Sequence, residues 1–224
     1  HQSTISGKWE RSKFTGNEVF NKTLGIIGLG KIGSRVAKAA IALGMKVLVC
    51  DPYASQEHID ELGAKRIKSL DEFWPLCDFI TLHVPKTRET MYLINKNTLN
   101  RMKKGVRIIN CARGALIDEE ALKEAIESGQ VAAAAIDVYE NEPVKPECPL
   151  LHCNGHILLT PHLGASTKEA QLNVAIDVAE QIRDVLSGGS AKSAVNIPYL
   201  KADKLEPVKD YMLLAENIGK LIRQ

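Results

Sequence analysis

The chain has 224 residues, which is enough for one large domain or for one domain and part of another. A formal net charge of +2, with no basic run, argues against a nucleic-acid partner or a charged membrane surface. The longest apolar runs have the length of strands, and five scattered cysteines form no disulfide pattern, so we expect a cytoplasmic protein without a membrane segment.

Residues 1–20 are polar and follow no clear period, so we predict an arm that leads into the first strand. Trp9 is unusual in so polar a segment. It can cover the edge of its own domain, or it can anchor a subunit contact, where tryptophan is enriched. The sequence leaves both interpretations open.

The strongest motif lies in residues 23–51. The apolar residues 24–27 predict a buried parallel strand, and the glycines of a G-x-G-x-x-G pattern follow it at Gly28, Gly30 and Gly33. The first glycine permits a tight turn, the second lets a pyrophosphate approach the backbone, and the third lets the next helix pack closely. That helix is predicted from Lys31 to a stop at Gly44.

A second predicted strand, 46–50, ends in Asp51, whose carboxylate can accept hydrogen bonds from the adenosine ribose. The same carboxylate would repel a 2′-phosphate, and Pro52 and Tyr53 offer no arginine to neutralise one, so the sequence favours NAD over NADP. A β-α-β unit without a ligand is the competing interpretation. Strand, turn, helix, strand and acid within about 30 residues favour the dinucleotide site.

After Asp51, predicted strands and helices continue to alternate along the chain. Further strands are predicted at 64–67, 79–84, 106–110, 131–138 and 156–160, and helices at 55–62, 69–74, 95–102, 119–128 and 166–186. Ser69 with Glu72 and Ser166 with Glu169 have the spacing of capping boxes. The alternation predicts an α/β fold with a doubly wound parallel sheet, a Rossmann-type dinucleotide-binding domain.

Ligands of such sheets bind beyond the carboxyl ends of the strands, and three of those ends carry reactive side chains. Arg113 directly follows a buried strand, where it can clamp a substrate carboxylate or serve as a structural ion-pair partner. His162 follows the last strand and suits proton transfer, although a single histidine can also be structural. Glu142 is the candidate to orient His162, with Glu140 as its competitor.

Other candidates are weaker. Asp137 can reach a nicotinamide amide or cap a turn, and packing explains Cys111 as well as reactivity does. A cluster rich in cysteine and histidine matches no standard zinc spacing, so we predict no metal site among Cys148, His152, Cys153 and His156.

These motifs together resemble the D-isomer-specific 2-hydroxyacid dehydrogenases. The resemblance rests on G-L-G-K-I-G with Asp51, N-C-A-R-G around Arg113, A-I-D-V-Y-E-N-E-P around Glu142 and T-P-H-L-G around His162. It implies NAD-linked oxidation of a 2-hydroxy acid, with Arg113 on the carboxylate, His162 as acid and base, and Glu142 assisting. Segments 74–81 and 162–171 are similar to members that act on a phosphorylated substrate.

The resemblance also implies a cofactor site. Its residues would be Gly28, Gly30, Lys31, Ile32, Gly33, Asp51, Val84, Pro85, Cys111, Ala112, Arg113, Asp137, His162, Gly164 and Ala165. Lys31 and Ile32 would bind pyrophosphate through their backbone. Some members carry threonine where this chain has Val84, which would leave only backbone contacts there. Members pair through this domain, which implies a homodimer or a higher oligomer.

The chain begins with His1 and ends within a predicted helix that starts near Pro207, so we expect a fragment with most of the substrate domain missing. Residues 1–20 would belong to the arm from that domain, 21–195 to the NAD-binding domain, and 196–224 to a segment leading into a further domain. Such a fragment would bind NAD and turn over substrate poorly. The alternatives are another enzyme of the family, such as a glyoxylate or hydroxypyruvate reductase, and an NAD-sensing corepressor on the same scaffold.

Overall fold

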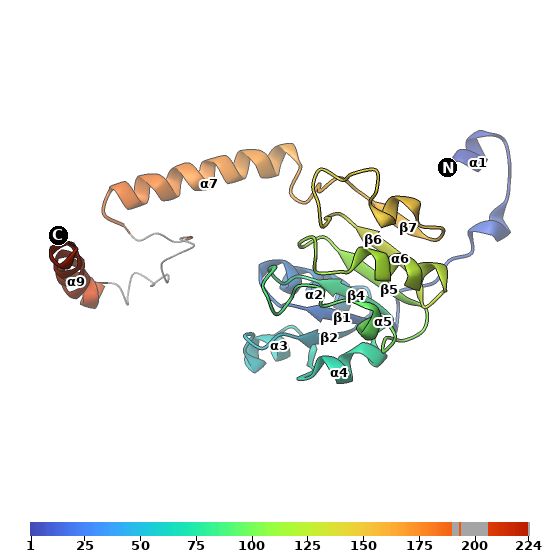
Figure 1. Cartoon of the computed structure of the whole chain (residues 1–224), viewed down its shortest axis with the longest axis horizontal. Coiled ribbons are helices and arrows are strands. Elements are labelled where there is room, and N and C mark those ends of the chain that lie inside the picture. The colour runs from blue at the N-terminus through green and yellow to red at the C-terminus, as the bar shows by residue number, and fades with distance from the viewer. Residues whose placement is uncertain (190–192, 194–205, 224) are drawn as a thin grey trace. The chain divides into compact units, whose positions relative to one another are not determined.

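The computed structural model describes residues 1–189, 193 and 206–223 (Figure 1). The chain divides into two compact units, His1–Gly164 and Ala165–Gln224. The second unit holds the helices α7 (Lys168–Leu186) and α9 (Lys209–Ile222), with a 3-10 turn at Glu206–Val208 before α9. The first unit holds the sheet and the candidate catalytic residues.

The first unit is built on one parallel sheet, which has seven strands in the described part of the chain. They are β1 (Thr23–Ile27), β2 (Lys46–Cys50), β3 (Lys65–Arg66), β4 (Phe79–Leu82), β5 (Val106–Asn110), β6 (Val131–Ile136) and β7 (Ile157–Leu159). Their order across the sheet is β3-β2-β1-β4-β5-β6-β7, and every pair is parallel. The order reverses direction between β1 and β4, which confirms the predicted doubly wound sheet.

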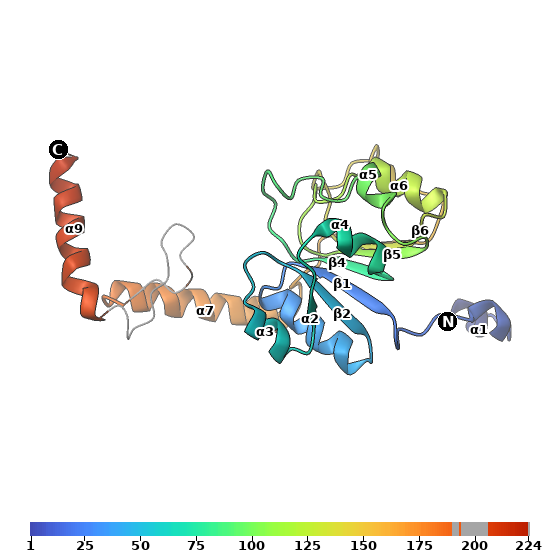
Figure 2. The ribbon, with the colours of Figure 1, turned by 90° about the horizontal axis from the view of Figure 1, so that it is seen from below.

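Helices cover both faces of the sheet. They are α2 (Lys31–Ala42), α3 (Gln56–Glu61), α4 (Leu70–Phe73), α5 (Lys96–Leu99) and α6 (Glu119–Glu127), with 3-10 turns at Trp74–Leu76 and Pro149–His152. Figure 2 shows α2 and α3 on one face and α4, α5 and α6 on the other. One apolar core joins β1 and β2 to α2 and α3, and a larger one joins β4, β5 and β6 to α4, α5 and α6. Burial of this apolar surface is the main term that stabilises the layers.

The helix caps confirm some sequence predictions and correct one. Asp118 caps α6 through the Ala121 N–H (3.0 Å), as expected. The predicted start of α7 at Ser166 is wrong, because Thr167 is the N-cap and its hydroxyl accepts from Ala170 (3.1 Å). Both residues can cap a helix, and the spacing to Glu169 favoured the wrong one.

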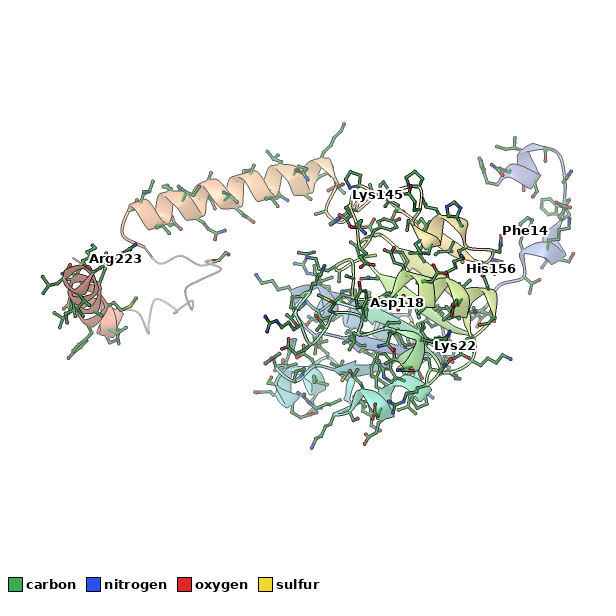
Figure 3. All side chains as sticks on the ribbon, in the orientation of Figure 1. Phe14, Lys22, Asp118, Lys145, His156 and Arg223 are labelled. Carbon is green, nitrogen blue, oxygen red and sulfur yellow. The ribbon has the colours of Figure 1, made fainter. Side chains whose placement is uncertain are left out.

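The arm holds two short helical turns that the sequence did not predict, α1 (Gln2–Ile5) and a 3-10 turn at Arg11–Phe14. Phe14, labelled in Figure 3, is 66% exposed and Trp9 is 85% exposed. Trp9 therefore does not cover the edge of its own domain in this structure. The predicted boundary between residues 195 and 196 lies outside the described residues. No helix among the described residues combines the length and the apolar character that crossing a bilayer requires.

Candidate functional site

The glycine turn after β1 lies at the point where the strand order reverses. Gly28 has a φ of +92°, and a Cβ on it would lie 2.6 Å from the carbonyl oxygen of His83. A Cβ on Gly33 would overlap the carbonyl of Gly28. Only glycine fits this close approach of α2 to the end of β1. The turn therefore has the geometry that the motif predicted.

The N-terminus of α2 faces the carboxyl edge of the sheet without a side-chain cap. Gly30 is the N-cap, and among the described residues no side-chain hydrogen bond caps the helix. Lys31 and Ile32 are exposed there. Open N–H groups at the positive end of a helix dipole favour an anion such as a pyrophosphate.

Asp51 organises the turn that follows β2. Its Oδ2 accepts from the Leu29 N–H of the glycine turn (2.6 Å), and its Oδ1 accepts from Tyr53 (2.7 Å) and Ala54 (3.2 Å). A cavity of about 740 Å³ lies beside it. The cavity is lined by Cys50, Asp51, Pro52, Gln56, Arg66, Ile67, Lys68, Ser69, Leu70 and Asp71. The sequence did not place Arg66 at this edge, and parallel pairing of β2 with β3 brings it there.

The end of β4 closes the glycine turn from the other side. Val84 is half-buried, and its Cγ1 would lie 2.8 Å from a Cβ on Gly28. The carbonyl of Pro85 accepts from the Thr90 hydroxyl (2.6 Å). Burial lowers the pKa of His83, whose ring lies 3.1 Å from the Thr81 hydroxyl. These residues shape the middle of the carboxyl edge, and no charged side chain stands among them.

A buried amide holds the loop that carries Arg113. Asn110, the last residue of β5, is 2% exposed. Its Nδ2 donates to the Arg113 carbonyl (3.0 Å), and its Oδ1 accepts from the Ala112 N–H (3.1 Å). The Arg113 side chain is exposed and donates to the Ala112 carbonyl (2.6 Å). Cys111 is exposed, and partial burial and the Asp137 charge raise the pKa of its thiol.

The structure pairs His162 with Glu142. The His162 Nδ1 lies 2.6 Å from Glu142 Oε2, and Glu142 Oε1 accepts from the Tyr139 N–H (2.9 Å). The bond with His162 and then the bond from Tyr139 lower the pKa of Glu142. Glu140 instead accepts from the Tyr92 hydroxyl. His162 has a φ of +51°, a left-handed conformation that is rare outside glycine and concentrated at functional sites.

Asp137 holds the segment that carries His162. It is 5% exposed and accepts from the Thr160 hydroxyl (2.6 Å), the Leu163 N–H (2.8 Å) and the Gly164 N–H (2.9 Å). Burial alone would raise the pKa of Asp137, but these hydrogen bonds outweigh it and lower the pKa. These three bonds join the end of β6 to the segment after β7, so Asp137 caps that turn, which fits one of the interpretations that the sequence offered.

Gly114 brings the loop that carries Arg113 against the segment that carries Glu142. A Cβ on Gly114 would overlap the carbonyl of Tyr139, so the segment after Arg113 lies directly against the segment before Glu142. Sequence reasoning missed the supporting roles of Asn110, Gly114 and Thr160. A polar residue that ends a buried strand, as Asn110 does, is the signal that could have identified one of them.

Ala165, the last predicted cofactor residue, belongs to the second unit, where it is exposed and its carbonyl accepts from the Thr167 N–H (2.8 Å). Two members of the cluster Cys148, His152, Cys153 and His156 bind different partners. His152 Nε2 lies 2.7 Å from the Pro146 carbonyl, and the Cys148 thiol donates to Glu119 (3.3 Å). Among the described residues, no three His, Cys, Asp or Glu side chains are grouped so that they could hold a metal ion.

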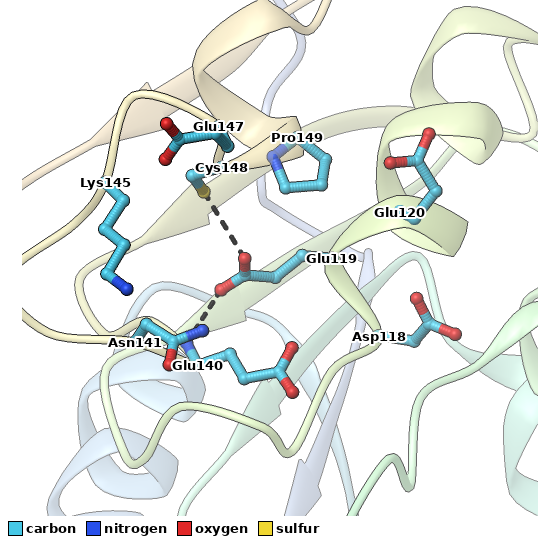
Figure 4. Close-up of a pocket in the computed structure, with 9 residues that line it drawn as sticks. All are labelled: Asp118, Glu119, Glu120, Glu140, Asn141, Lys145, Glu147, Cys148 and Pro149. Atoms are coloured by element: carbon cyan, nitrogen blue, oxygen red, sulfur yellow. Dashed lines mark hydrogen bonds between the residues drawn. The ribbon is translucent and has the colours of Figure 1, made fainter.

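A separate pocket of about 240 Å³ lies between the N-terminus of α6 and the segment 140–149 (Figure 4). Its lining is Asp118, Glu119, Glu120, Glu140, Asn141, Lys145, Glu147, Cys148 and Pro149. Glu119 at its centre already accepts from the Glu140 N–H (2.8 Å) and from Cys148. Five acids against one lysine repel anions, so this pocket does not suit an anionic ligand.

Comparison with known proteins gives one consistent family. The model for the NAD-binding domain of D-isomer-specific 2-hydroxyacid dehydrogenases matches residues 1–164. The chain is 54% identical over 224 residues to D-3-phosphoglycerate dehydrogenase of Synechocystis sp., covering 100% of this chain and 40% of that protein. It is 46% identical over 225 residues to the Homo sapiens protein of the same name, covering 99% and 42%. The chain thus spans about two fifths of the length of these curated relatives.

Solved structures agree on the fold. A glyoxylate reductase from Paecilomyes thermophila has a TM-score of 0.73 and 40% identity, with 82% of this chain and 55% of that chain covered. The apo D-mandelate dehydrogenase of Rhodotorula graminis has a TM-score of 0.79 and 30% identity, with 88% and 60% covered.

Proposed function

Because the chain belongs to the D-isomer-specific 2-hydroxyacid dehydrogenases, with NAD as their cofactor, we propose that it is the cofactor-binding part of a D-3-phosphoglycerate dehydrogenase. The reaction is the oxidation of D-3-phosphoglycerate to 3-phosphohydroxypyruvate, the first step of serine biosynthesis. The observation that carries the proposal is the His162–Glu142 pair at 2.6 Å, in which the segment of Glu142 lies against the loop of Arg113 at Gly114. The names of the relatives at 54% and 46% identity support the substrate.

His162 is the proposed base. Its Nδ1 faces the ionised Glu142, so the neutral ring carries its proton there and leaves Nε2 free to accept the proton of the substrate hydroxyl. Glu142 fixes this tautomer and stabilises the imidazolium that forms. NAD held at this site would supply the acceptor for the hydride that leaves the hydroxyl-bearing carbon, which becomes the carbonyl carbon of the product. In the reverse direction His162 returns the proton to the carbonyl oxygen.

Arg113 is the proposed clamp for the substrate carboxylate. Its guanidinium is exposed, and the buried Asn110 fixes its backbone through the bond to the Arg113 carbonyl. A planar guanidinium can bind both oxygens of a carboxylate at once, which orients the substrate as well as holding it. Lysine at this position would supply charge without that orientation.

We propose that NAD lies along the carboxyl edge, with its pyrophosphate at the α2 N-terminus and its adenosine ribose at Asp51. The site consists of Gly28, Gly30, Lys31, Ile32, Gly33, Asp51, Val84, Pro85, Cys111, Ala112, Arg113, Asp137, His162, Gly164 and Ala165. The uncapped N–H groups of α2 and the close approach at Gly28 support this placement. Asp137 would reach the nicotinamide amide only with lone pairs that its three loop donors leave free.

We further propose a cytoplasmic homodimer, or a higher oligomer built from it, that pairs through this domain. Trp9, which is 85% exposed on the arm, is the candidate contact. Residues 1–20 would then be an arm from the substrate domain, 21–195 the NAD-binding domain, and 196–224 a segment leading to a further domain. The phosphate-binding groups would lie in parts of the relatives that this chain does not cover.

An assay of the full-length protein on a panel of D-2-hydroxy acids with NAD tests the proposal. We expect D-3-phosphoglycerate to give the highest kcat/KM. We also expect the chain alone to bind NAD in calorimetry but to turn over substrate poorly in the activity assay. A preference for glycolate or glycerate would favour a glyoxylate or hydroxypyruvate reductase, as the glyoxylate reductase likeness suggests. Tight NAD binding without turnover of any substrate would favour a cofactor-sensing protein.

A further inference from the structure

Arg66 reaches from the edge strand β3 to the turn that follows β2. Its Nε donates to the Gln56 side chain (2.9 Å), and its Nη1 donates to the Asp51 carbonyl (2.8 Å). Its Nη2 donates to the Ala54 carbonyl. One guanidinium therefore holds three points of the segment 51–56.

The Asp51 carboxylate holds the same turn through a second set of hydrogen bonds. That side chain accepts from Leu29 in the glycine turn and from Tyr53 and Ala54 within its own turn. Arg66 fixes the main chain of Asp51, while Leu29 fixes its side chain. The carboxylate is consequently oriented by two separate elements of the fold before any ribose arrives.

We propose that Arg66 is a positioning residue for the adenosine ribose of NAD, acting through Asp51. This inference rests on the proposed function, since it assigns Arg66 to the same cofactor site. The guanidinium donates from three separate nitrogens held in one rigid plane, whereas an ammonium carries all its donors on a single nitrogen. Without that brace, the turn after β2 is free to rotate the carboxylate away from the ribose hydroxyls.

The contacts of Arg66 separate this role from a simple surface ion pair. Its three acceptors are two backbone carbonyls and an amide oxygen, so its hydrogen bonds go to neutral groups of the turn. An exposed ion pair adds little to stability and would constrain no backbone. Hydrogen bonds from a charged donor to a turn backbone constrain its conformation directly.

Calorimetric titration of the protein with NAD and with ADP-ribose tests the proposal through R66K and R66Q. We expect both variants to bind either ligand about tenfold more weakly, because both lose the planar guanidinium. R66K keeps the positive charge, so it separates the loss of the guanidinium geometry from the loss of charge. R107K is the matched control. Arg107 is a half-buried strand arginine near the amino end of β5, stacked 5.2 Å from the Phe79 ring, and its variant should bind NAD as the wild type does.

A double-variant cycle with D51N decides whether Arg66 acts through Asp51. We expect R66K to cost less than about twofold in NAD affinity when Asp51 is already asparagine, since coupled residues are not additive. Equal losses in both backgrounds, or unchanged NAD affinity in R66K, would overturn the proposal. A wild-type protein that fails to bind NAD would refute the proposed function itself, which the R66K comparison alone cannot do.

Discussion

The two halves of the carboxyl edge hold their candidate residues in opposite ways. At the ends of β1 and β2, Asp51 both organises the turns and is the proposed ligand of the ribose. At the ends of β5, β6 and β7 these tasks are divided. Asn110 and Asp137 are buried and hold the loops, while Arg113 and His162 stand exposed. In the nucleotide half Asp51 therefore combines ligand binding with support, with Arg66 bracing its turn, whereas the reaction half separates support from chemistry.

The difference follows from what each half must do. A ribose hydroxyl needs only a hydrogen-bond acceptor, and a carboxylate with four lone-pair sites can accept from backbone N–H groups and from a ligand together. A base must change its protonation state during each turnover. Because the base lies outside the hydrogen bonds that hold its loop, it can change its protonation state without disturbing that loop.

The largest effect should come from removing the exposed base. We expect His162→Ala in the full-length protein to lower kcat by about 10²- to 10⁴-fold while NAD affinity stays within about twofold. Steady-state oxidation of D-3-phosphoglycerate and calorimetry with NAD measure the two effects. His156→Ala, an exposed histidine just before β7, is the control and should leave both unchanged. An unaltered kcat in His162→Ala would refute the division between support and chemistry.

Removing a buried support should instead lower stability. Asp137→Asn places an amide N–H where the carboxylate accepts hydrogen bonds, which should cost about 1 to 3 kcal/mol in the free energy of unfolding at pH 7. Because the folded pKa of Asp137 lies below its ordinary value of 3.8, this stabilisation is complete above that value and disappears as the pH falls through the folded pKa.

Urea unfolding at pH 7 and at pH 3 measures this dependence. The gap between wild type and Asp137→Asn should narrow at the lower pH. Asp60→Asn, an exposed acid on α3, should change stability little at either pH. A gap that widened on acidification would mean that the hydrogen bonds to Asp137 do not stabilise its charged form.

Glu142→Gln should have an intermediate effect on activity. The neutral amide cannot stabilise the imidazolium, so kcat should fall about tenfold with little change in the KM for NAD. Since its hydrogen bonds lower the pKa of Glu142 from 4.5, the carboxylate is ionised throughout the neutral range and the loss should be constant there. Glu140→Gln is the matched control, because Glu140 faces Tyr92. An equal loss of kcat in both variants would contradict the pairing.

The smallest effect is expected in the nucleotide half, at His58. Its Nε2 lies 3.0 Å from the hydroxyl of Ser34 on α2, and its ring is half-exposed. His58→Ala should change NAD affinity by no more than about twofold, since a hydrogen bond at an exposed site contributes little. Calorimetry with NAD measures it. A tenfold loss would show that His58, in addition to Arg66, supports the nucleotide half.

The sequence predicted most of the fold because the fingerprint and the strand periodicity are local signals. The doubly wound parallel sheet, with Arg113 and His162 following the carboxyl ends of strands, followed from the alternation of strands and helices, whereas the strand order came only from the structure. The choice between Glu142 and Glu140 required the path of the chain after β6, which spacing does not encode. Arg66 was missed for the same reason, since its turn lies 15 residues away in the chain and only strand pairing joins them.

The contact at Gly114 has a consequence for anyone who would alter the substrate range. Because no side chain fits between this position and Tyr139, the two loops share one surface and cannot be varied independently. A library around Arg113 that also randomises Gly114 would contain mostly misfolded members, because any side chain at that position overlaps the Tyr139 carbonyl. Exchange of both segments together, taken as a matched pair from one relative, is the unit of recombination that this fold allows.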